Sequence, residues 1–463
     1  MKLAKEISPA GKADEGWQPS LRGIARKARE ERNHRFGGLY QMLNQRTLRE
    51  CFYRLRKKAA SGVDGITFRD YEKNLDRNLE DLERRLKHKS YHARLVRRKY
   101  IPKGGGKLRP LGIPVLEDKL VQYGAAQILQ TIYEEDFEAS SYGYRPGLGP
   151  HDAVRELTKE LQFEGANHVV EADIKGYFEN IQWVLLLKML EKRVHDKAFI
   201  GLIRKWLRAG ILEEDGKVIH PVTGTPQGGV ISPVLANVYL HYALDLWFRE
   251  EVQRKNRGRS RLYRYADDFV GCFEREEEAR AFEQALKERL ALYGLEVAPE
   301  KTKKIRFGRT GGEENERFDF LGFEFRWDRS RAGKPTVKRR TSRKKLRASV
   351  QRFGDWIKQK RHVKLSKLMS TLRAKYRGYW GYYGIIGNFE SLHQFKDATE
   401  RLLYKWLNRR SQKRSLTWKS LRRVLDRFQM PRPRITESRN TQMPVQLVWD
   451  LDRTTVKVLN SPC

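Results

Sequence analysis

The sequence predicts an α+β fold followed by an all-helical region. Strand-like apolar runs alternate with helical patterns between residues 167 and 325, as in "NHVVEADIKGYF" and "RLYRYADDFVGCF". That order of strand, helix, hairpin, helix and strand predicts a sheet with helices on one face. The composition then changes, because Arg329–Arg347 contains ten Lys and Arg residues and no acid, and the chain that follows has a helical pattern up to about residue 428.

The net charge indicates a polyanionic partner. The 463 residues include 95 Lys and Arg against 58 Asp and Glu, a formal net charge of +37, and 39% of the chain is hydrophobic. Such an excess on a globular chain points to nucleic acid. An anionic membrane surface is the rival partner. It is disfavoured because the sequence shows no apolar run long enough to span a bilayer and no lipidation motif.

The cysteines and the first residues predict a cytoplasmic protein without zinc. Cys51, Cys272 and Cys463 are far apart and fit neither a disulfide framework nor a paired zinc site. The segment "MKLAKEISPAGKADEGWQPS" lacks the apolar stretch of a signal peptide. We therefore expect a reducing compartment.

Individual elements follow from local patterns. A basic helix covers residues 20–35, and a second helix over 71–91 places Leu75, Leu79, Leu82 and Leu86 on one face. Residues 94–114 predict a hairpin that turns at Gly104–Gly106. Further helices are expected at 150–164, 183–211 and 277–293.

Two adjacent aspartates, Asp267 and Asp268, stand at a turn between two half-buried strands. A solvated turn is the ordinary explanation for such a pair. Here the pair sits in an aromatic, apolar run, where side-by-side carboxylates repel each other and are costly to desolvate, so a positive charge should compensate them. Asp173 ends another apolar strand. If that strand neighbours the hairpin, three carboxylates converge and require cations.

Two divalent ions about 3.5–4 Å apart are the usual arrangement for nucleotidyl transfer, and Mg²⁺ prefers oxygen ligands. The sequence thus predicts a site for two Mg²⁺ ions, in which Mn²⁺ can substitute.

Five blocks in order resemble a known family. "KLRPLGIP", "ADIKGYF", "TPQGGVISP", "YADD" and "FLGF" closely resemble the ordered motifs of reverse transcriptases, and more narrowly of those encoded by bacterial group II introns. The resemblance runs from about residue 35 to about residue 430 and implies a right-hand polymerase. Its fingers and palm would combine an antiparallel sheet with helices, and an all-helical thumb or maturase domain would follow.

The resemblance also implies domain ranges. Residues 1–90 would form an N-terminal extension and the start of the fingers, 91–328 the fingers and palm, and 329–430 a basic linker and the helical thumb. Residues 431–463 would be an irregular tail without an HNH-type endonuclease, because the chain has no CxxC pair. In the thumb, most of the dense aromatic residues would pack in the helix core, and some would stack on single-stranded RNA.

Roles for single residues are implied block by block. Asp173, Asp267 and Asp268 would be the catalytic metal ligands, together with the Ile174 carbonyl. Phe178 would lie under the incoming sugar and exclude a 2′-hydroxyl, although core packing is the ordinary role of any single Phe. The expected nucleotide-binding residues are Arg97, Lys103, Arg109, Phe178, Gln227 and Gly228. The expected template or primer contacts are Lys301, Phe320, Leu321, Gly322, Lys338, Arg339 and Arg340.

The implied function is RNA-directed DNA polymerisation. The enzyme would extend a DNA or RNA primer on an RNA template with dNTPs, and would bind its own intron RNA to assist splicing and mobility into a DNA target. One alternative is a maturase that only binds RNA, which the intact set of motif residues disfavours. A domesticated enzyme of defence or repair, such as a CRISPR-linked one, shares the chemistry and stays open. A viral-type RNA polymerase is disfavoured by the aromatic Phe178.

Overall fold

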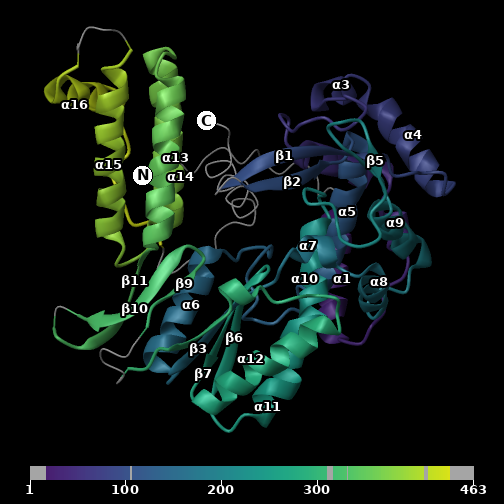
Figure 1. Ribbon diagram of the computed structural model, residues 1–463. Helices are drawn as coiled ribbons and strands as arrows, with labels where there is room; N and C mark the ends of the chain where they lie inside the picture. Colours follow the sequence, from purple (N-terminus) through teal and green to yellow (C-terminus); the bar gives the residue numbers. More distant parts are fainter. Residues whose placement is uncertain (1–16, 105–106, 310–315, 331, 411–415, 438–463) are drawn as a thin grey trace. The chain divides into compact units, whose positions relative to one another are not determined.

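The computed structural model describes residues 17–104, 107–309, 316–330, 332–410 and 416–437 (Figure 1). The chain divides into two compact units. The first comprises Met1–Lys99, Pro110–Phe137 and Ile181–Tyr239, and the second comprises Tyr100–Arg109, Glu138–Asn180 and Leu240–Cys463.

The first unit is mainly helical. Its helices are α1 (Trp17–Glu30), η1 (Tyr40–Met42), α2 (Gln45–Arg54), α3 (Phe68–Glu72), α4 (Leu75–Lys87), α5 (Leu116–Tyr133), α8 (Trp183–Glu191), α9 (Lys197–Leu207) and α10 (Ser232–Leu240, whose last residue belongs to the second unit). The four leucines expected on one face of α4 are all buried, which confirms that the 3.6-residue period marked the core-facing side.

A small sheet accompanies these helices, with strand order β2-β1-β4-β5. Its strands are β1 (Val96–Gly104), β2 (Lys107–Ile113), β4 (Ile211–Leu212) and β5 (Val218–Ile219). The hairpin predicted around Gly104–Gly106 is β1 and β2, and its far part, Tyr100–Arg109, is assigned to the second unit. β1 runs parallel to β4 through Val96 and Ile211.

The second unit contains two sheets and the helices around them. Its strands are β3 (His168–Asp173), β6 (Ser260–Tyr265), β7 (Asp268–Phe273), β8 (Lys303–Arg306), β9 (Phe318–Phe320), β10 (Phe323–Arg329) and β11 (Pro335–Thr341). Its helices are α6 (Pro150–Phe163), α7 (Tyr177–Asn180), η2 (His241–Asp245), η3 (Phe248–Val252), α11 (Gln253–Lys255), α12 (Glu276–Ala291), η4 (Pro299–Lys301), α13 (Arg343–Lys360), α14 (Leu365–Tyr383), α15 (Phe389–Leu407) and α16 (Trp418–Arg427).

The larger sheet, which we call the palm sheet, has the antiparallel order β6-β7-β3-β8. Side chains alternate between its faces. Val169 and Val270 point to one face and share a core cluster with Leu157 of α6. On the other face, a side chain at Gly271 would meet Phe282 of α12. Helices therefore cover both faces, and the expectation of one covered face is wrong, because apolar side chains are buried on both, Val169 and Val270 on one face and Phe269 on the other.

The smaller sheet has the order β11-β10-β9. Its strand β11 lies within the basic run that the sequence led us to expect in a linker to an all-helical region. β11 pairs with β10 along its whole length, from Phe323–Thr341 to Arg329–Pro335. The helices of the thumb begin at Arg343, directly after this strand. Buried and more exposed positions alternate along β11, with Val337, Arg339 and Thr341 buried, and the consecutive cations hid that period in the sequence.

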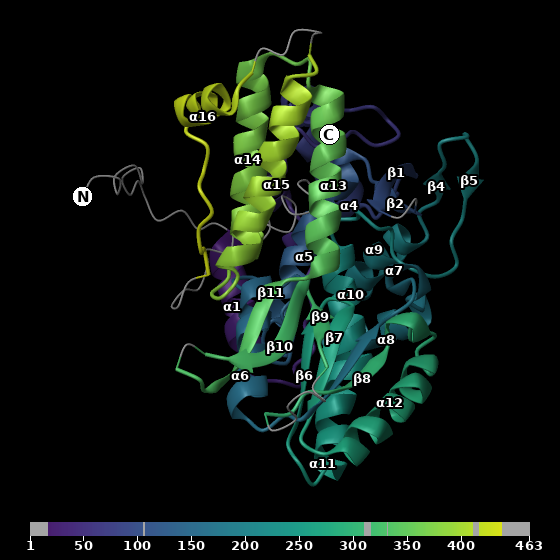
Figure 2. The same ribbon diagram turned by 60° about the vertical axis from the view of Figure 1, so that its left-hand side comes forward.

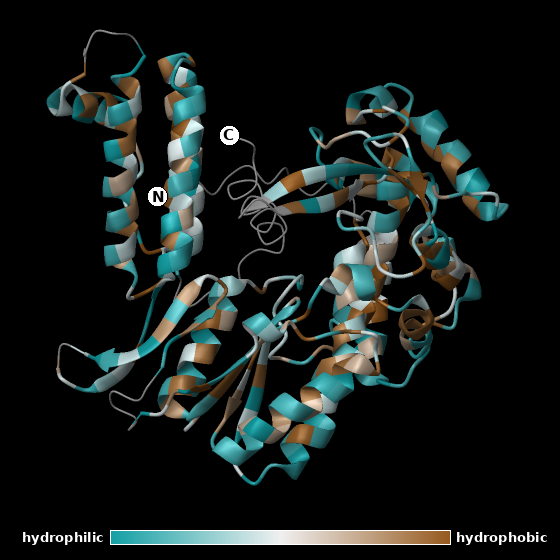
Figure 3. Ribbon diagram, viewed as in Figure 1, coloured by the Kyte–Doolittle hydropathy of each residue, from teal (hydrophilic) through white to brown (hydrophobic). Residues whose placement is uncertain are grey.

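The thumb consists of α13, α14, α15 and α16 (Figure 2). Its helices carry many hydrophilic residues (Figure 3), yet they enclose an aromatic core. Tyr376, Tyr379, Trp380 and Tyr383 of α14 are buried, while Tyr382 is partly exposed. Tyr379 stacks on Phe395 of α15 with ring centroids 3.7 Å apart. The expectation that most of these aromatics pack together is confirmed. The same core cluster reaches Val169 and Val270, so thumb and palm strands form one unit.

Candidate active site

The hairpin of β6 and β7 holds the two adjacent aspartates. Tyr265 pairs directly with Asp268, so only Ala266 and Asp267 form the loop. Ala266 has φ of +57°, in the left-handed region that the twist of two-residue hairpins requires at the first loop position. A non-glycine residue there costs free energy. We call Tyr265–Asp268 the aspartate turn.

Asp173 lies opposite this turn. β3 pairs with β7 so that Asp173 and Asp268 are direct partners across the ladder. Partners in antiparallel strands point to the same face of a sheet. Asp268 is exposed, and Asp173 and Asp267 are half-buried. From the sequence it could only be assumed that the strand of Asp173 lies beside the YADD hairpin. In the structure the two strands are neighbours.

The same face carries a further acid, Glu171. Burial raises the pKa of Glu171 to about 7, and repulsion by Asp319, Asp268 and Asp173 acts in the same direction, against the attraction of Lys303. Because neighbouring carboxylates disfavour the charged form of Glu171, the electrostatic potential at this end of the sheet is negative. A cation bound here would relieve that repulsion.

The donor set fits a hard divalent cation. Across the described ranges, no three His, Cys, Asp or Glu side chains gather closely enough to hold a metal ion by themselves. Mg²⁺, however, commonly takes one or two protein carboxylates and completes its shell with water and substrate phosphate oxygens. Asp173, Asp267 and Asp268 offer such oxygens. Ile174 is buried and forms a bridge with Val297.

Phe178 lies in the short helix α7, which follows β3. Its ring makes edge-to-face contacts with the rings of Tyr177 and Tyr144, with ring centroids 5.4 and 6.5 Å apart. Phe178 itself is half-buried. The aromatic contacts fix its orientation while part of the ring stays accessible, which is compatible with contact to a ligand.

Three predicted nucleotide-binding residues belong to the first unit. Gly228 has φ of +110°, and a Cβ there would lie 2.5 Å from the carbonyl oxygen of Gly112. The Gly112 nitrogen donates to the Gln227 carbonyl at 2.5 Å. The "PQGG" loop is therefore pressed against β2, and only glycine fits at 228. Arg97 is half-buried in β1. Arg109 lies in β2, within the second unit, and the Lys103 side chain is outside the described part.

The "FLGF" block forms the turn between β9 and β10. Phe320 is buried, whereas Leu321 and Gly322 form the turn with φ of +51° and +80°. The Tyr382 hydroxyl of α14 donates to the Leu321 carbonyl at 2.9 Å. Contact with a primer would therefore fall to the turn and not to the Phe320 ring. The Lys301 side chain lies outside the described part.

The basic residues of β11 have carboxylate partners. Lys338 pairs with Asp328 at 3.1 Å and Arg340 with Glu324 at 2.6 Å. Arg339 points the other way and is buried against Glu437, which accepts two hydrogen bonds of 3.0 and 3.1 Å. Arg339 thus fastens the segment after α16 to β11, a contact that no pattern in the sequence predicts.

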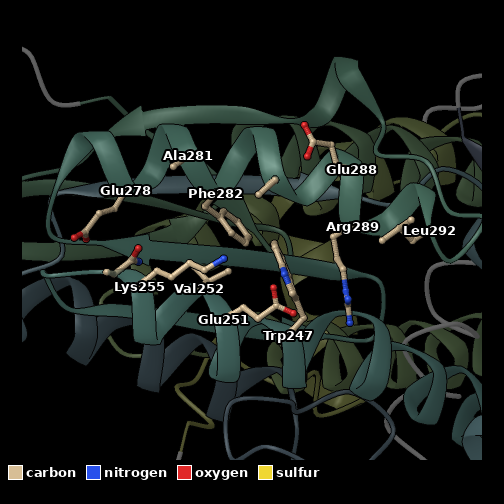
Figure 4. A pocket seen from close by; sticks show the side chains of 12 residues that line it. Trp247, Glu251, Val252, Lys255, Glu278, Ala281, Phe282, Glu288, Arg289 and Leu292 are labelled. Carbon is tan, nitrogen blue, oxygen red and sulfur yellow. The ribbon is translucent and has the colours of Figure 1, made fainter.

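A hollow of about 360 Å³ lies between α12 and the helical segment 247–256 (Figure 4). Its polar groups already serve the protein. Glu278 accepts from the backbone nitrogens of Arg257 and Gly258, and Arg289 donates to the carbonyls of Tyr242 and Ala243. We assign no ligand to it.

Two residues that support the aspartate turn were not found from the sequence. A Cβ at Gly143 would lie 2.3 Å from the Ala266 nitrogen, and the buried Arg264 donates to the Ala266 carbonyl at 3.1 Å. The only available signal was an arginine inside an apolar strand, "RLYRYADD". Such a residue is rare unless it is paired.

A sheet that brings aspartates from two strands together, followed by a helical thumb, places the chain in the class of nucleic-acid polymerases. Comparison with known proteins specifies the class. Residues 101–325 match the family model described as reverse transcriptase (RNA-dependent DNA polymerase). The chain belongs to the reverse transcriptase family, in the branch of the group II intron-encoded proteins.

Individual relatives show the extent of the similarity. The group II intron-encoded protein LtrA of Lactococcus lactis subsp. cremoris is 37% identical over 223 residues, which is 48% of this chain and 37% of LtrA. Protein YkfC of Escherichia coli is 34% identical over 316 residues, 60% of this chain and 78% of YkfC. An uncharacterized 91 kDa protein in the cob intron of Schizosaccharomyces pombe is 41% identical over 156 residues, 34% and 19% of the two chains. The match therefore spans little more than a third of LtrA.

No described helix is both long and apolar enough to cross a membrane. Cys51 and Cys272 are buried free thiols.

Proposed function

We propose that this protein is an RNA-directed DNA polymerase that extends a primer on an RNA template by two-metal nucleotidyl transfer. The observation that carries the proposal is the pairing of Asp173 with Asp268, next to Asp267 in the aspartate turn, within the region that matches the family. Reverse transcriptases generally use divalent ions such as Mg²⁺, and Mn²⁺ should substitute.

Each residue then has a defined task. Asp173, Asp267 and Asp268 would hold the ions, with the Ile174 carbonyl as a further oxygen. When held by these oxygens, divalent ions would supply Lewis acidity that lowers the pKa of the primer 3′-hydroxyl and offsets charge at the α-phosphate. Phe178 would exclude a 2′-hydroxyl, and Gln227 and Gly228 would line the nucleotide site. Arg97, Lys103 and Arg109 would hold the triphosphate of the dNTP.

We further propose that the protein binds intron RNA to assist splicing and mobility at a DNA target, in the cytoplasm. Helix α13 supports an RNA surface, because its basic residues are all exposed and only Asp355 opposes them. They are Arg343, Lys344, Lys345, Arg347, Arg352, Lys358 and Lys360. Seven exposed cations on one helix attract a phosphate backbone. Lys301, Leu321, Gly322, Lys338 and Arg340 would add template or primer contacts.

The test is primer extension on an RNA template with Mg²⁺ and either dNTPs or rNTPs. Asp267→Ala should abolish extension with dNTPs while its affinity for template-primer stays within about twofold of wild type. Asp215→Asn is the matched control, since Asp215 is an exposed carboxylate between β4 and β5, and should leave extension intact. Tight RNA binding without extension by the wild type, in Mg²⁺ and Mn²⁺ alike, would refute the polymerase and favour a maturase that only binds RNA.

A further inference from the structure

Arg264 lies on the back of the aspartate turn. In the ladder it pairs with Phe269, one position from the Tyr265–Asp268 pair. Because side chains alternate along a strand, Arg264 points to the face opposite Asp268 and Asp173. Its side chain is 1% exposed. A guanidinium is not found in such surroundings unless it is paired.

The partner is Asp245, whose side chain is 3% exposed. Arg264 Nε donates to Oδ1 at 2.7 Å and Nη2 donates to Oδ2 at 2.5 Å. This is the two-pronged geometry that fixes a guanidinium in its plane. The remaining nitrogen, Nη1, donates to the carbonyl oxygen of Ala266 at 3.1 Å. One rigid group therefore joins a buried carboxylate to the loop of the aspartate turn.

The Ala266 carbonyl belongs to the peptide bond that leads into Asp267. Peptide bonds are planar, so a hydrogen bond to this oxygen fixes the orientation of the bond from which Asp267 extends. Ala266 has φ of +57°, a conformation that persists only where its surroundings hold it. Arg264 supplies that support from behind the sheet.

Asp245 is itself held by an unusual helix. It ends η2, a π-helical stretch, and such stretches often occur at functional sites. The carbonyls of Tyr242 and Ala243 in η2 accept hydrogen bonds of 3.2 and 2.9 Å from Arg289 of α12. The Arg289 guanidinium lies 5.8 Å from the Trp247 ring centre (Figure 4).

The backbone of Arg264 is fixed as well. Its nitrogen donates to the Ser140 carbonyl at 2.9 Å, and its carbonyl accepts from the Tyr142 nitrogen at 2.8 Å. The Arg264 backbone is therefore held on both sides by hydrogen bonds. A displacement of Asp245 would be transmitted to Ala266.

We propose that Asp245 and Arg264 are positioning residues, which orient the Ala266–Asp267 peptide so that Asp267 presents its carboxylate to the catalytic ion. The inference rests on the proposed polymerase function. A purely stabilising role is the competing explanation. Buried ion pairs contribute little net stability compared with apolar residues of similar size, so stability alone does not account for the bridge to Ala266.

The experiment compares Arg264→Lys and Asp245→Asn with a matched control. Lysine cannot reach both Asp245 and the Ala266 carbonyl, and asparagine keeps the shape of Asp245 without its charge. The control is Arg193→Lys in the first unit. Arg193 is likewise buried, pairs with Asp136 at 2.9 Å and donates to the carbonyl of Glu31 at 3.1 Å. It should lose similar stability without touching the turn.

Four quantities are measured for each variant: the Tm, the kcat and the KM for dNTP at saturating template-primer, and the Kd for Mn²⁺ by calorimetry. We expect both turn variants to lower kcat by roughly 10²-fold with KM within twofold, since a 1 Å displacement of a catalytic group has about that effect. Mn²⁺ binding should weaken by roughly tenfold or more. The control should match their Tm loss and keep kcat and Mn²⁺ affinity within twofold.

The inference is overturned if the turn variants lose no more kcat and Mn²⁺ affinity than Arg193→Lys at equal Tm loss. A wild-type protein that extends no primer would refute the proposed function instead. In that case the Mn²⁺ titration, read against Asp267→Ala, still decides whether Arg264 positions the carboxylate.

Discussion

Gly143 packs against the aspartate turn, and replacing it with alanine should displace that turn. The Cβ of alanine would lie 2.3 Å from the Ala266 nitrogen and 3.0 Å from the Tyr265 carbonyl carbon. Ordinary contact begins at 3.4 Å, so one of the two backbones must move by about 1 Å. Both atoms met are backbone atoms, and no side-chain rotation can relieve the overlap.

A shift of that size at the proposed metal ligands should reduce the rate of nucleotide addition by roughly 10²-fold. This corresponds to about 2.7 kcal/mol in the activation barrier. The assay is single-turnover primer extension on an RNA template, with the affinity for template-primer measured in parallel. Affinity should stay within about twofold, because the substitution leaves the charge of the protein unchanged.

Gly201→Ala is the matched control. Gly201 lies inside α9, and a Cβ there would meet nothing within 4 Å. The control should keep the wild-type rate and gain about 0.5–1 kcal/mol of stability, as alanine does for glycine in a helix. If Gly143→Ala extends primers at the wild-type rate with an unchanged Tm, the position of the aspartate turn does not limit catalysis and the reasoning is wrong.

Three further predictions concern other parts of the chain. Phe178→Ala should lower the preference for dNTPs over rNTPs by roughly 10²-fold, because the proposed barrier to the 2′-hydroxyl would be gone. If the ratio of kcat/KM for dNTPs to kcat/KM for rNTPs is unchanged, Phe178 does not contact the sugar. Burial lowers the pKa of His241 from 6.5 to about 4, so folding favours the neutral imidazole. This preference stabilises the fold fully above pH 6.5, and the stabilisation, roughly 3 kcal/mol in all, is lost as the pH falls towards 4. His241→Gln should therefore flatten the fall of Tm between pH 7 and pH 5, and a slope equal to that of wild type would contradict this. Glu437→Gln should lower the free energy of unfolding by about 3–5 kcal/mol, since it leaves the buried Arg339 guanidinium without its countercharge, and it should speed proteolysis of residues 431–437. Asp328→Asn breaks a more exposed pair and should lower the free energy of unfolding by less than about 1 kcal/mol. Equal losses for the two variants would show that the Arg339 pair does not stabilise the fold more than the exposed pair.

Local patterns in the sequence predicted many of the elements and the expected chemistry. The leucine spacing of α4 identified its buried face, and the glycines between β1 and β2 identified a hairpin. The family motifs predicted Asp173, Asp267 and Asp268 as metal ligands, since the order of such blocks depends on residue types alone. The alternation of strand and helix also predicted an α+β fold. These signals are local because helical and strand periods are set by the backbone.

Tertiary structure decided how those pieces support one another. β11 is a strand because β10 offers it a partner, although its cations suggested a linker. Helices α6 and α12 cover opposite faces because β3 and β7 bury apolar side chains on both faces. The contact of Gly143 with Ala266 spans 123 residues of sequence, and neither residue type announces it. The sequence likewise predicted a positive charge near the aspartates. Only the fold shows that Arg264 donates hydrogen bonds to Asp245 and to the turn backbone from the opposite face of the sheet. Such contacts depend on the packing of distant segments, which no local period encodes.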